Sequence, residues 1–196
     1  MSVVDSNLQI AQAIGKAGPK EILSQQDVLT VQYWGFDNLE HQGQIVINKL
    51  LSVEVQEWFE LASRLKFPIE KVAPAVLYDN DDDKLMALNV SSGFNYRKIA
   101  GTSKLSRHAM GRAFDINPRQ NPYIRKEGSS VIIAPSGAVW DSSQPGTLFR
   151  THELVRFMLD RGWIWGGDWS LEESGRIDYQ NFESRCWLAM CELFSK

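Results

Sequence analysis

The stretch Ser106-Arg107-His108-Ala109-Met110-Gly111-Arg112-Ala113-Phe114-Asp115 places a histidine seven residues before a carboxylate. If residues 113–116 form a short strand after a turn at Gly111, then Asp115 points to one face of the strand and Phe114 to the other. A histidine on the turn can approach the same point as Asp115, and an imidazole nitrogen and a carboxylate oxygen are both zinc ligands. The alternative is a histidine in a surface turn and an aspartate that caps or pairs locally.

The length and composition predict one globular domain. The 196 residues are 43% apolar and 11% aromatic, which is enough for a substantial core. The formal charge is -3, with acidic and basic residues interspersed, so the sequence offers no polyanion-binding face and we expect no nucleic-acid partner. No apolar segment approaches the length needed to cross a bilayer, so we expect no membrane span. We expect a monomer.

The two ends of the chain carry little functional information. The N-terminus has neither the basic start nor the apolar run of a cleaved export signal. Either the protein is not exported by such a signal, or the signal is not part of this sequence. Cys186 and Cys191 are five residues apart in an expected C-terminal helix, where we expect them to pack as small apolar groups rather than form a disulfide.

The spacing of apolar residues predicts an alternation of helices and short strands. Helical periodicity predicts helices over residues 7–14, 52–65, 147–161 and 183–194. β-branched or alternating runs predict strands over residues 44–48, 72–78, 91–97, 113–116 and 131–134. The proline-containing segment 116–123 is expected to be a loop. Trp58 and Phe59 are expected to pack in the core.

Three other polar features are expected to be structural. His41 lies beside a turn glycine and is expected to be solvated or bonded to the backbone rather than to bind a metal. His152 lies near the start of a predicted helix, where a metal role is not expected. The acidic run Asn80-Asp81-Asp82-Asp83 lacks the spacing of a calcium loop, so we expect it to be a solvated loop.

The stretch Trp163-Ile164-Trp165-Gly166-Gly167-Asp168-Trp169 combines three tryptophans with a glycine pair. This composition predicts a strand that enters a tight turn requiring glycine torsions, with aromatic surface beside it. A purely structural role for the stretch is equally compatible with the pattern.

Several motifs together resemble the zinc peptidases of the D-alanyl-D-alanine carboxypeptidase family. This family includes VanY-type carboxypeptidases and phage L-alanyl-D-glutamate endolysins, and it has a hedgehog-type α+β fold with a small antiparallel sheet flanked by helices. The motifs that carry the resemblance occur in family order, and they are Phe94-Asn95-Tyr96-Arg97, residues 105–118, Asn121-Pro122-Tyr123, residues 162–169 and Asp178-Tyr179-Gln180. The resemblance implies a family-matching core over residues 41–196, preceded by a helical extension over residues 1–40.

The resemblance also assigns roles by position. His108 and Asp115 match the first two zinc ligands, Asp178 matches the general base, and Arg97 matches a basic residue that steadies a substrate carbonyl or carboxylate. The last zinc ligand of the family is a histidine, and Asn181 stands at that position. An amide oxygen coordinates zinc more weakly than imidazole does, so the site is expected to bind zinc weakly, to take a harder metal, to recruit another ligand or to stay empty.

The implied reaction is hydrolysis of a peptide bond in a peptidoglycan stem peptide, with Zn²⁺ as cofactor. The expected substrate-binding residues are Ser106, Trp165, Asp168 and Trp169. The family implies the cell envelope or periplasm as location, with a cytoplasmic or phage-type origin left open. Because of Asn181, a second reading is an impaired or inactive homologue that binds cell-wall peptides without cleaving them. A third is that the fold serves an unrelated partner.

Overall fold

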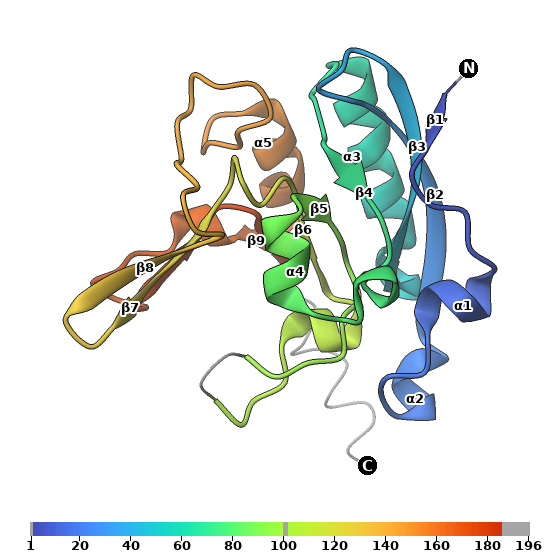
Figure 1. Cartoon of the computed structure of the whole chain (residues 1–196), viewed down its shortest axis with the longest axis horizontal. Helices are drawn as coiled ribbons and strands as arrows, with labels where there is room; N and C mark the ends of the chain where they lie inside the picture. The colour runs from blue at the N-terminus through green and yellow to red at the C-terminus, as the bar shows by residue number, and fades with distance from the viewer. Residues whose placement is uncertain (1, 100–101, 186–196) are drawn as a thin grey trace.

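The computed structural model describes residues 2–99 and 102–185, and Figure 1 shows their arrangement. The predicted α+β class is confirmed, since helices and several small sheets form one compact domain. The helices are α1 Ile10–Ile14, α2 Lys20–Leu23, α3 Ser52–Arg64, α4 Asp82–Ala87 and α5 Glu153–Asp160, with 3-10 turns η1 Lys49–Leu51, η2 Ala75–Tyr78, η3 Arg107–Met110 and η4 Gly166–Asp168. None of the helices within the described ranges is long and apolar enough to cross a membrane.

The strands form four small sheets among the described residues. Strand order is β1-β3-β2, β10-β7-β8, β6-β11-β9 and β4-β5. Their bounds are β1 Val3–Val4, β2 Gln26–Trp34, β3 Glu40–Asn48, β4 Lys71–Val72, β5 Val90–Ser91, β6 Ala113–Asp115, β7 Tyr123–Glu127, β8 Ser130–Ala134, β9 Trp163–Trp165, β10 Arg176–Asp178 and β11 Asn181–Ser184. In Figure 1 the β7–β8 hairpin projects from the body of the domain.

The first sheet is a scaffold on which helix α3 packs. Strands β2 and β3 are antiparallel and pair from Gln26 opposite Asn48 to Trp34 opposite Glu40. The predicted strand over 44–48 and helix over 52–65 are confirmed as β3 and α3. Residues 1–40 are not only helical, because they also contain β1 and all of β2. Strand β2 was not predicted, although its buried Val31 and Tyr33 alternate with the exposed Thr30 and Gln32 as in a half-buried strand.

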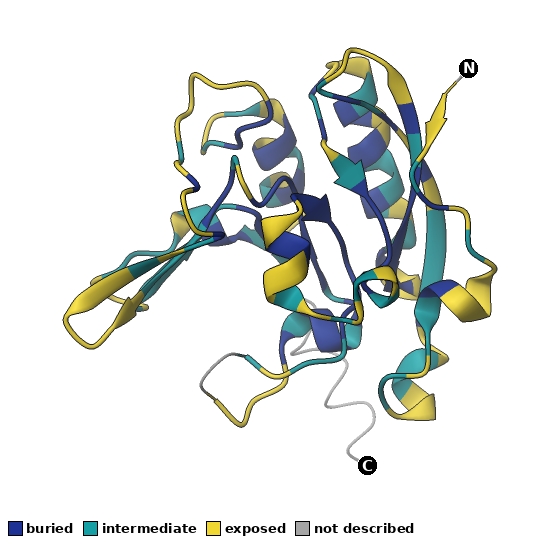
Figure 2. Cartoon of the chain, in the orientation of Figure 1, coloured by how far each residue is buried: buried dark blue, intermediate teal, exposed yellow. Residues whose placement is uncertain are grey.

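An aromatic cluster joins α3 to the sheet that carries β6 and β11. Trp58 is fully buried, as predicted, and its ring centroid lies 5.5 Å from that of Phe114. Phe114 also stacks on Phe182 of β11 at 5.2 Å. Figure 2 shows buried residues along one side of α3 and in the strands at the centre of the domain. Because strand residues alternate, burying Phe114 and Phe182 turns their neighbours Asp115 and Asn181 toward the opposite face.

Several predicted elements are wrong in type or extent. The strand predicted over 72–78 ends at Val72, because Pro74 cannot donate to a ladder and instead precedes the 3-10 turn η2 as its N-cap. The strand predicted over 91–97 is reduced to β5, and the helix predicted over 147–161 begins only at Glu153. The segment around Tyr123, expected to be loop, begins strand β7.

The predicted C-terminal helix over 183–194 is wrong at its start, since Glu183 and Ser184 belong to strand β11. The remainder of that prediction, with Cys186 and Cys191, lies outside the described residues. Helix α1 and strand β8 match the predictions over 7–14 and 131–134, with shorter or shifted bounds.

His41 is buried and bonded to carboxylates, so the prediction of a solvated or backbone-bonded side chain is wrong. Its Nδ1 lies 2.8 Å from Asp5 Oδ2, and its Nε2 lies 3.1 Å from Asp37. The hydroxyl of Tyr33 donates to the same oxygen of Asp5. Because both partners of the ring accept hydrogen bonds, the ring must carry both protons to make both bonds. The imidazolium therefore fastens the N-terminal segment to the β2–β3 hairpin.

This arrangement predicts a pH-dependent contribution to stability. Burial lowers the pKa of His41, but the bonds to Asp5 and Asp37 outweigh it and raise the pKa above its ordinary value of 6.5. The folded state then binds more protons than the unfolded state above pH 6.5, so the stabilisation is complete below that pH and is lost as the pH rises through the folded pKa. In denaturant unfolding, the stability difference between the wild type and His41→Gln should shrink as the pH is raised. A difference that is constant with pH would contradict this assignment.

Candidate active site

The unit that runs from Ser106 to Asp115 folds as the sequence predicted. Ser106 caps the turn η3 by accepting a hydrogen bond from the amide of His108 at 3.3 Å. Gly111 ends the turn with φ of 63°, a left-handed conformation that favours glycine. A Cβ at Gly111 would also stand 1.9 Å from the Gln26 side-chain oxygen. The chain then enters β6, which holds Asp115 rigidly beside His108.

The two ring nitrogens of His108 have different partners: Nε2 faces the site, and Nδ1 binds a backbone carbonyl. Its Nδ1 lies 2.7 Å from the Gly93 carbonyl, which only accepts, so Nδ1 carries a proton and donates it. Nε2 lies 3.3 Å from Asp115 Oδ2 and 3.2 Å from Asn181 Oδ1. Burial lowers the pKa of His108, and the negative charge and hydrogen bond of Asp115 outweigh this and raise it to about 9.

Strand β11 brings Asn181 to the same point. Asn181 and Asp115 are direct cross-strand partners in the antiparallel β6–β11 pair, so their side chains project on the same face. Both side chains are buried. The register thus converts two positions far apart in the sequence into neighbours of one histidine nitrogen.

Asp178 reaches the same hollow from strand β10. A hollow of about 90 Å³ is lined by His108, Asp115, Asp178 and Asn181, among others. Burial raises the pKa of Asp178 well above its ordinary value of 3.8, and the charge of Asp115 raises it further. Asp178 Oδ1 and Asp115 Oδ1 are both buried without a hydrogen-bond partner among the described residues. Two unsatisfied carboxylate oxygens indicate that the hollow is shaped for a ligand with positive charge or with donor groups.

The donors around His108 Nε2 fit a divalent cation. Neighbouring ligands of a tetrahedral zinc ion, each about 2.0–2.2 Å from the metal, lie roughly 3.3–3.6 Å apart. The 3.3 Å and 3.2 Å separations from Nε2 to Asp115 and Asn181 are close to that spacing. Within residues 2–99 and 102–185, however, no three His, Cys, Asp or Glu side chains are placed to hold a metal. One nitrogen and two oxygens form a weaker zinc set than one that contains a second imidazole.

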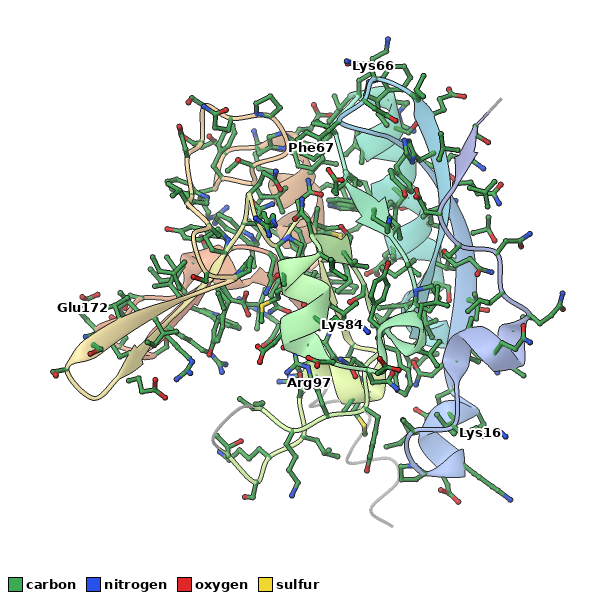
Figure 3. All side chains as sticks on the ribbon, in the orientation of Figure 1. Lys16, Lys66, Phe67, Lys84, Arg97 and Glu172 are labelled. Carbon is green, nitrogen blue, oxygen red and sulfur yellow. The ribbon has the colours of Figure 1, made fainter. Side chains whose placement is uncertain are left out.

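Arg97 and Asp82 also line the hollow. Arg97 Nη2 lies 2.8 Å from Asp82 Oδ1, and both side chains are partly buried. Arg97 Nε is buried without an acceptor among the described residues. Burial raises the pKa of Asp82, and the charge of Arg97 opposes this. Figure 3 shows Arg97 near the end of helix α4.

Asp82 is a charged site residue that was not predicted from the sequence. The run Asn80–Asp83 was predicted to be a solvated loop, but Asp81 caps helix α4 by accepting from the Lys84 amide at 3.1 Å. The helix begins at Asp82, and its side chain lines the hollow. The sequence does carry a signal for this helix, because an aspartate followed by further acidic residues is typical of a helix N-terminus.

Comparison with known families supports the interpretation of this site. Residues 100–184 match the family model described as D-alanyl-D-alanine carboxypeptidase, and this segment contains His108, Asp115, Asp178 and Asn181. This segment, 85 of the 196 residues, is similar to the D-alanyl-D-alanine carboxypeptidase family. The resemblance inferred from the motifs is thereby confirmed. No curated protein and no solved structure matches the chain significantly.

The structure brings only part of the expected substrate-binding set to the hollow. Ser106 and Trp169 line it, and Arg176 stacks over the Trp169 ring at 4.5 Å. Trp165 does not line it, because its ring is buried in the core and its Nε1 donates to the Tyr179 carbonyl at 2.8 Å. Asp168 does not line it either, because it points to Arg150, whose Nε lies 2.9 Å from its Oδ1.

The glycine pair after β9 acts by close approach rather than by torsion. The strand and tight turn were predicted correctly as β9 and η4, but neither Gly166 nor Gly167 has a positive φ. A Cβ at Gly166 would stand 2.4 Å from the Asp178 carbonyl oxygen, and one at Gly167 would stand 2.3 Å from the Trp165 ring. Gly166 therefore lets the turn pack directly against the strand that carries Asp178.

Gly166→Ala should displace Asp178. Because the new methyl group meets backbone as well as side-chain atoms, the contact cannot be relieved by a rotamer change. We expect a loss of about 1–3 kcal/mol in the free energy of unfolding, measured by denaturant titration. The exposed Glu172→Ala in the following turn is the control and should change stability by less than about 0.5 kcal/mol. Wild-type stability in the Gly166 variant would show that the close approach is not a constraint.

Proposed function

We propose that the protein is a peptidase of the D-alanyl-D-alanine carboxypeptidase type, which hydrolyses a peptide bond in peptidoglycan stem peptides. The observation that carries the proposal is the convergence of His108, Asp115 and Asp178 on one hollow, within the segment that matches the family. Stem peptides belong to the cell envelope, and we propose that this is where the protein acts, as a monomer.

We propose that His108, Asp115 and Asn181 hold a divalent metal, with zinc as the family's cofactor. When bound there, the metal supplies Lewis-acid polarisation of the peptide carbonyl and a more acidic water molecule. The Gly93 carbonyl supports this role, because it fixes the ring so that Nε2 faces the site. Asn181 provides only a neutral amide oxygen, so metal affinity depends mainly on His108 and Asp115.

Asp178 is proposed to act as the general base. A carboxyl group whose pKa is raised by burial exchanges protons closer to neutral pH than an exposed aspartate does. It would accept the proton of the attacking water and deliver it to the leaving amine. Arg97 is proposed to bind the carbonyl or carboxylate oxygen of the substrate, and its buried, unpartnered Nε provides the donor. Ser106 and Trp169 would form walls of the cleft.

A second candidate is a module that binds cell-wall peptides without cleaving them. It is favoured by one observation, namely that Asn181 occupies the third donor position beside His108. The substrate class would be unchanged, but the metal would be absent or weakly bound. Metal content and product release distinguish the two candidates.

Asn181→His should increase metal binding. A second imidazole in place of the amide gives a stronger zinc set, so we expect zinc to be retained at a higher molar ratio after dialysis and to resist chelator longer. Elemental analysis of both proteins measures this, with a parallel assay on purified muropeptides. If histidine changes neither metal content nor peptide release, then position 181 does not face a metal and the metal assignment is wrong.

Asp178→Asn should abolish most of the hydrolysis while it preserves peptide binding. Loss of a general base lowers kcat by about 10²–10⁴-fold. The control is Asp168→Asn, since Asp168 lies in the neighbouring turn and pairs with Arg150 away from the hollow. Release of D-alanine from a stem pentapeptide measures kcat, and calorimetry measures binding. Equal losses in the two variants would exclude a specific role for Asp178.

A further inference from the structure

We propose that Asp82 is a positioning residue, which holds the Arg97 guanidinium against one wall of the cleft so that Nε faces the substrate. This inference rests on the proposed function for its effect on catalysis. Its structural part, the control of the Arg97 side chain by Asp82, can be tested independently.

The first step of the argument concerns the two edges of Arg97. The Nη2 edge is engaged by Asp82 Oδ1 at 2.8 Å. The Nε edge is buried and has no acceptor within the described parts of the chain. A guanidinium has donors in a fixed fork, so fixing one nitrogen orients the others. The unpartnered Nε is therefore aimed by the pairing on the other edge.

The second step is that Asp82 is itself held firmly. Helix α4 starts at Asp82, and the preceding Asp81 caps it through the Lys84 amide. Leu85 of the same helix is buried in a cluster with Ala73, Ala75 and Val90. Figure 3 shows Arg97 close to one end of helix α4. The carboxylate thus extends into the cleft from a fixed support.

The third step is that Arg97 has competing partners. Asp115 and Asp178 each have a buried oxygen without a hydrogen-bond partner, and both residues line the same hollow as Arg97. A long, flexible cation beside such groups would be drawn to them. Pairing with Arg97 would occupy the carboxylates that are proposed to bind the metal and to take the proton. Asp82 prevents this by giving Arg97 a partner outside that set.

The test compares Asp82→Asn with Asp83→Asn. Both substitutions remove one negative charge from the first turn of α4, so both weaken the helix start equally. Of these two residues, only Asp82 lines the hollow. With a stem pentapeptide ending in D-alanyl-D-alanine, we expect kcat/KM to fall at least about tenfold in Asp82→Asn and to stay within about twofold of the wild type in Asp83→Asn.

A double-mutant cycle separates positioning from a direct role. If Asp82 acts through Arg97, adding Asp82→Asn to Arg97→Ala should cause no further loss in kcat/KM. Asp82→Glu, which keeps the charge, should restore part of the activity that Asp82→Asn loses. Additive losses, or equal losses in Asp82→Asn and Asp83→Asn, would overturn the proposal.

A measurement without substrate distinguishes failure of this proposal from failure of the proposed function. The Arg97 Nε–H resonance in ¹⁵N NMR should be slow to exchange in the wild type and in Asp83→Asn, and should shift and broaden in Asp82→Asn. If the wild type releases no product but this pattern is seen, the peptidase assignment fails and the positioning of Arg97 by Asp82 stands. An unchanged Arg97 resonance in Asp82→Asn would overturn the positioning role, whatever the activity.

Discussion

The pairing of β6 with β11 is the constraint on which the candidate site depends. Its register places Asp115 opposite Asn181 and Phe114 opposite Phe182. The two phenylalanines are drawn into the core with Trp58, and the alternation of a strand then fixes the polar pair on the other face. A slip of one residue would bury the polar pair in the core and expose the aromatic pair. Burial of the aromatic pair therefore determines where Asp115 and Asn181 lie.

Local hydrogen bonds and close packing place the remaining site residues beside Asp115 and Asn181. His108 is oriented by the Ser106 cap, the Gly93 carbonyl and the left-handed Gly111. Asp178 is set by the close packing of the Gly166 turn on its strand. In each case the position of the side chain is set by contacts that involve backbone atoms. Such anchoring keeps charged groups together in a buried place, where they would otherwise rearrange to pair with one another.

The sequence predicted the parts of the site that depend on local structure. His108, Gly111 and Asp115 lie within one turn and strand, so spacing and alternation were sufficient to place them. The helix start at Asp82 has a local signal, but the pairing of Asp82 with Arg97 is a tertiary contact that no local pattern encodes. Trp165 was expected at the cleft because of the tryptophan-rich motif, whereas the fold uses its ring as core and its Nε1 as a donor to the backbone. Strand β2, by contrast, has a local signal in the alternation of exposed and buried residues over 30–33, and this signal was overlooked.

The candidate base and two of the candidate metal ligands, Asp115 and Asn181, lie on different sheets. Asp178 belongs to the β10-β7-β8 sheet, whereas Asp115 and Asn181 belong to the β6-β11-β9 sheet, and only Tyr179 and Gln180 connect β10 to β11. The Tyr179 amide donates to the Pro122 carbonyl and the Gln180 carbonyl accepts from the Ile116 amide, so this short joint is fixed at both residues. Strand β7 continues into the projecting hairpin of Figure 1. The fixed joint therefore keeps Asp178 in a constant position relative to Asp115 and Asn181, even though the three residues are carried by two separate sheets.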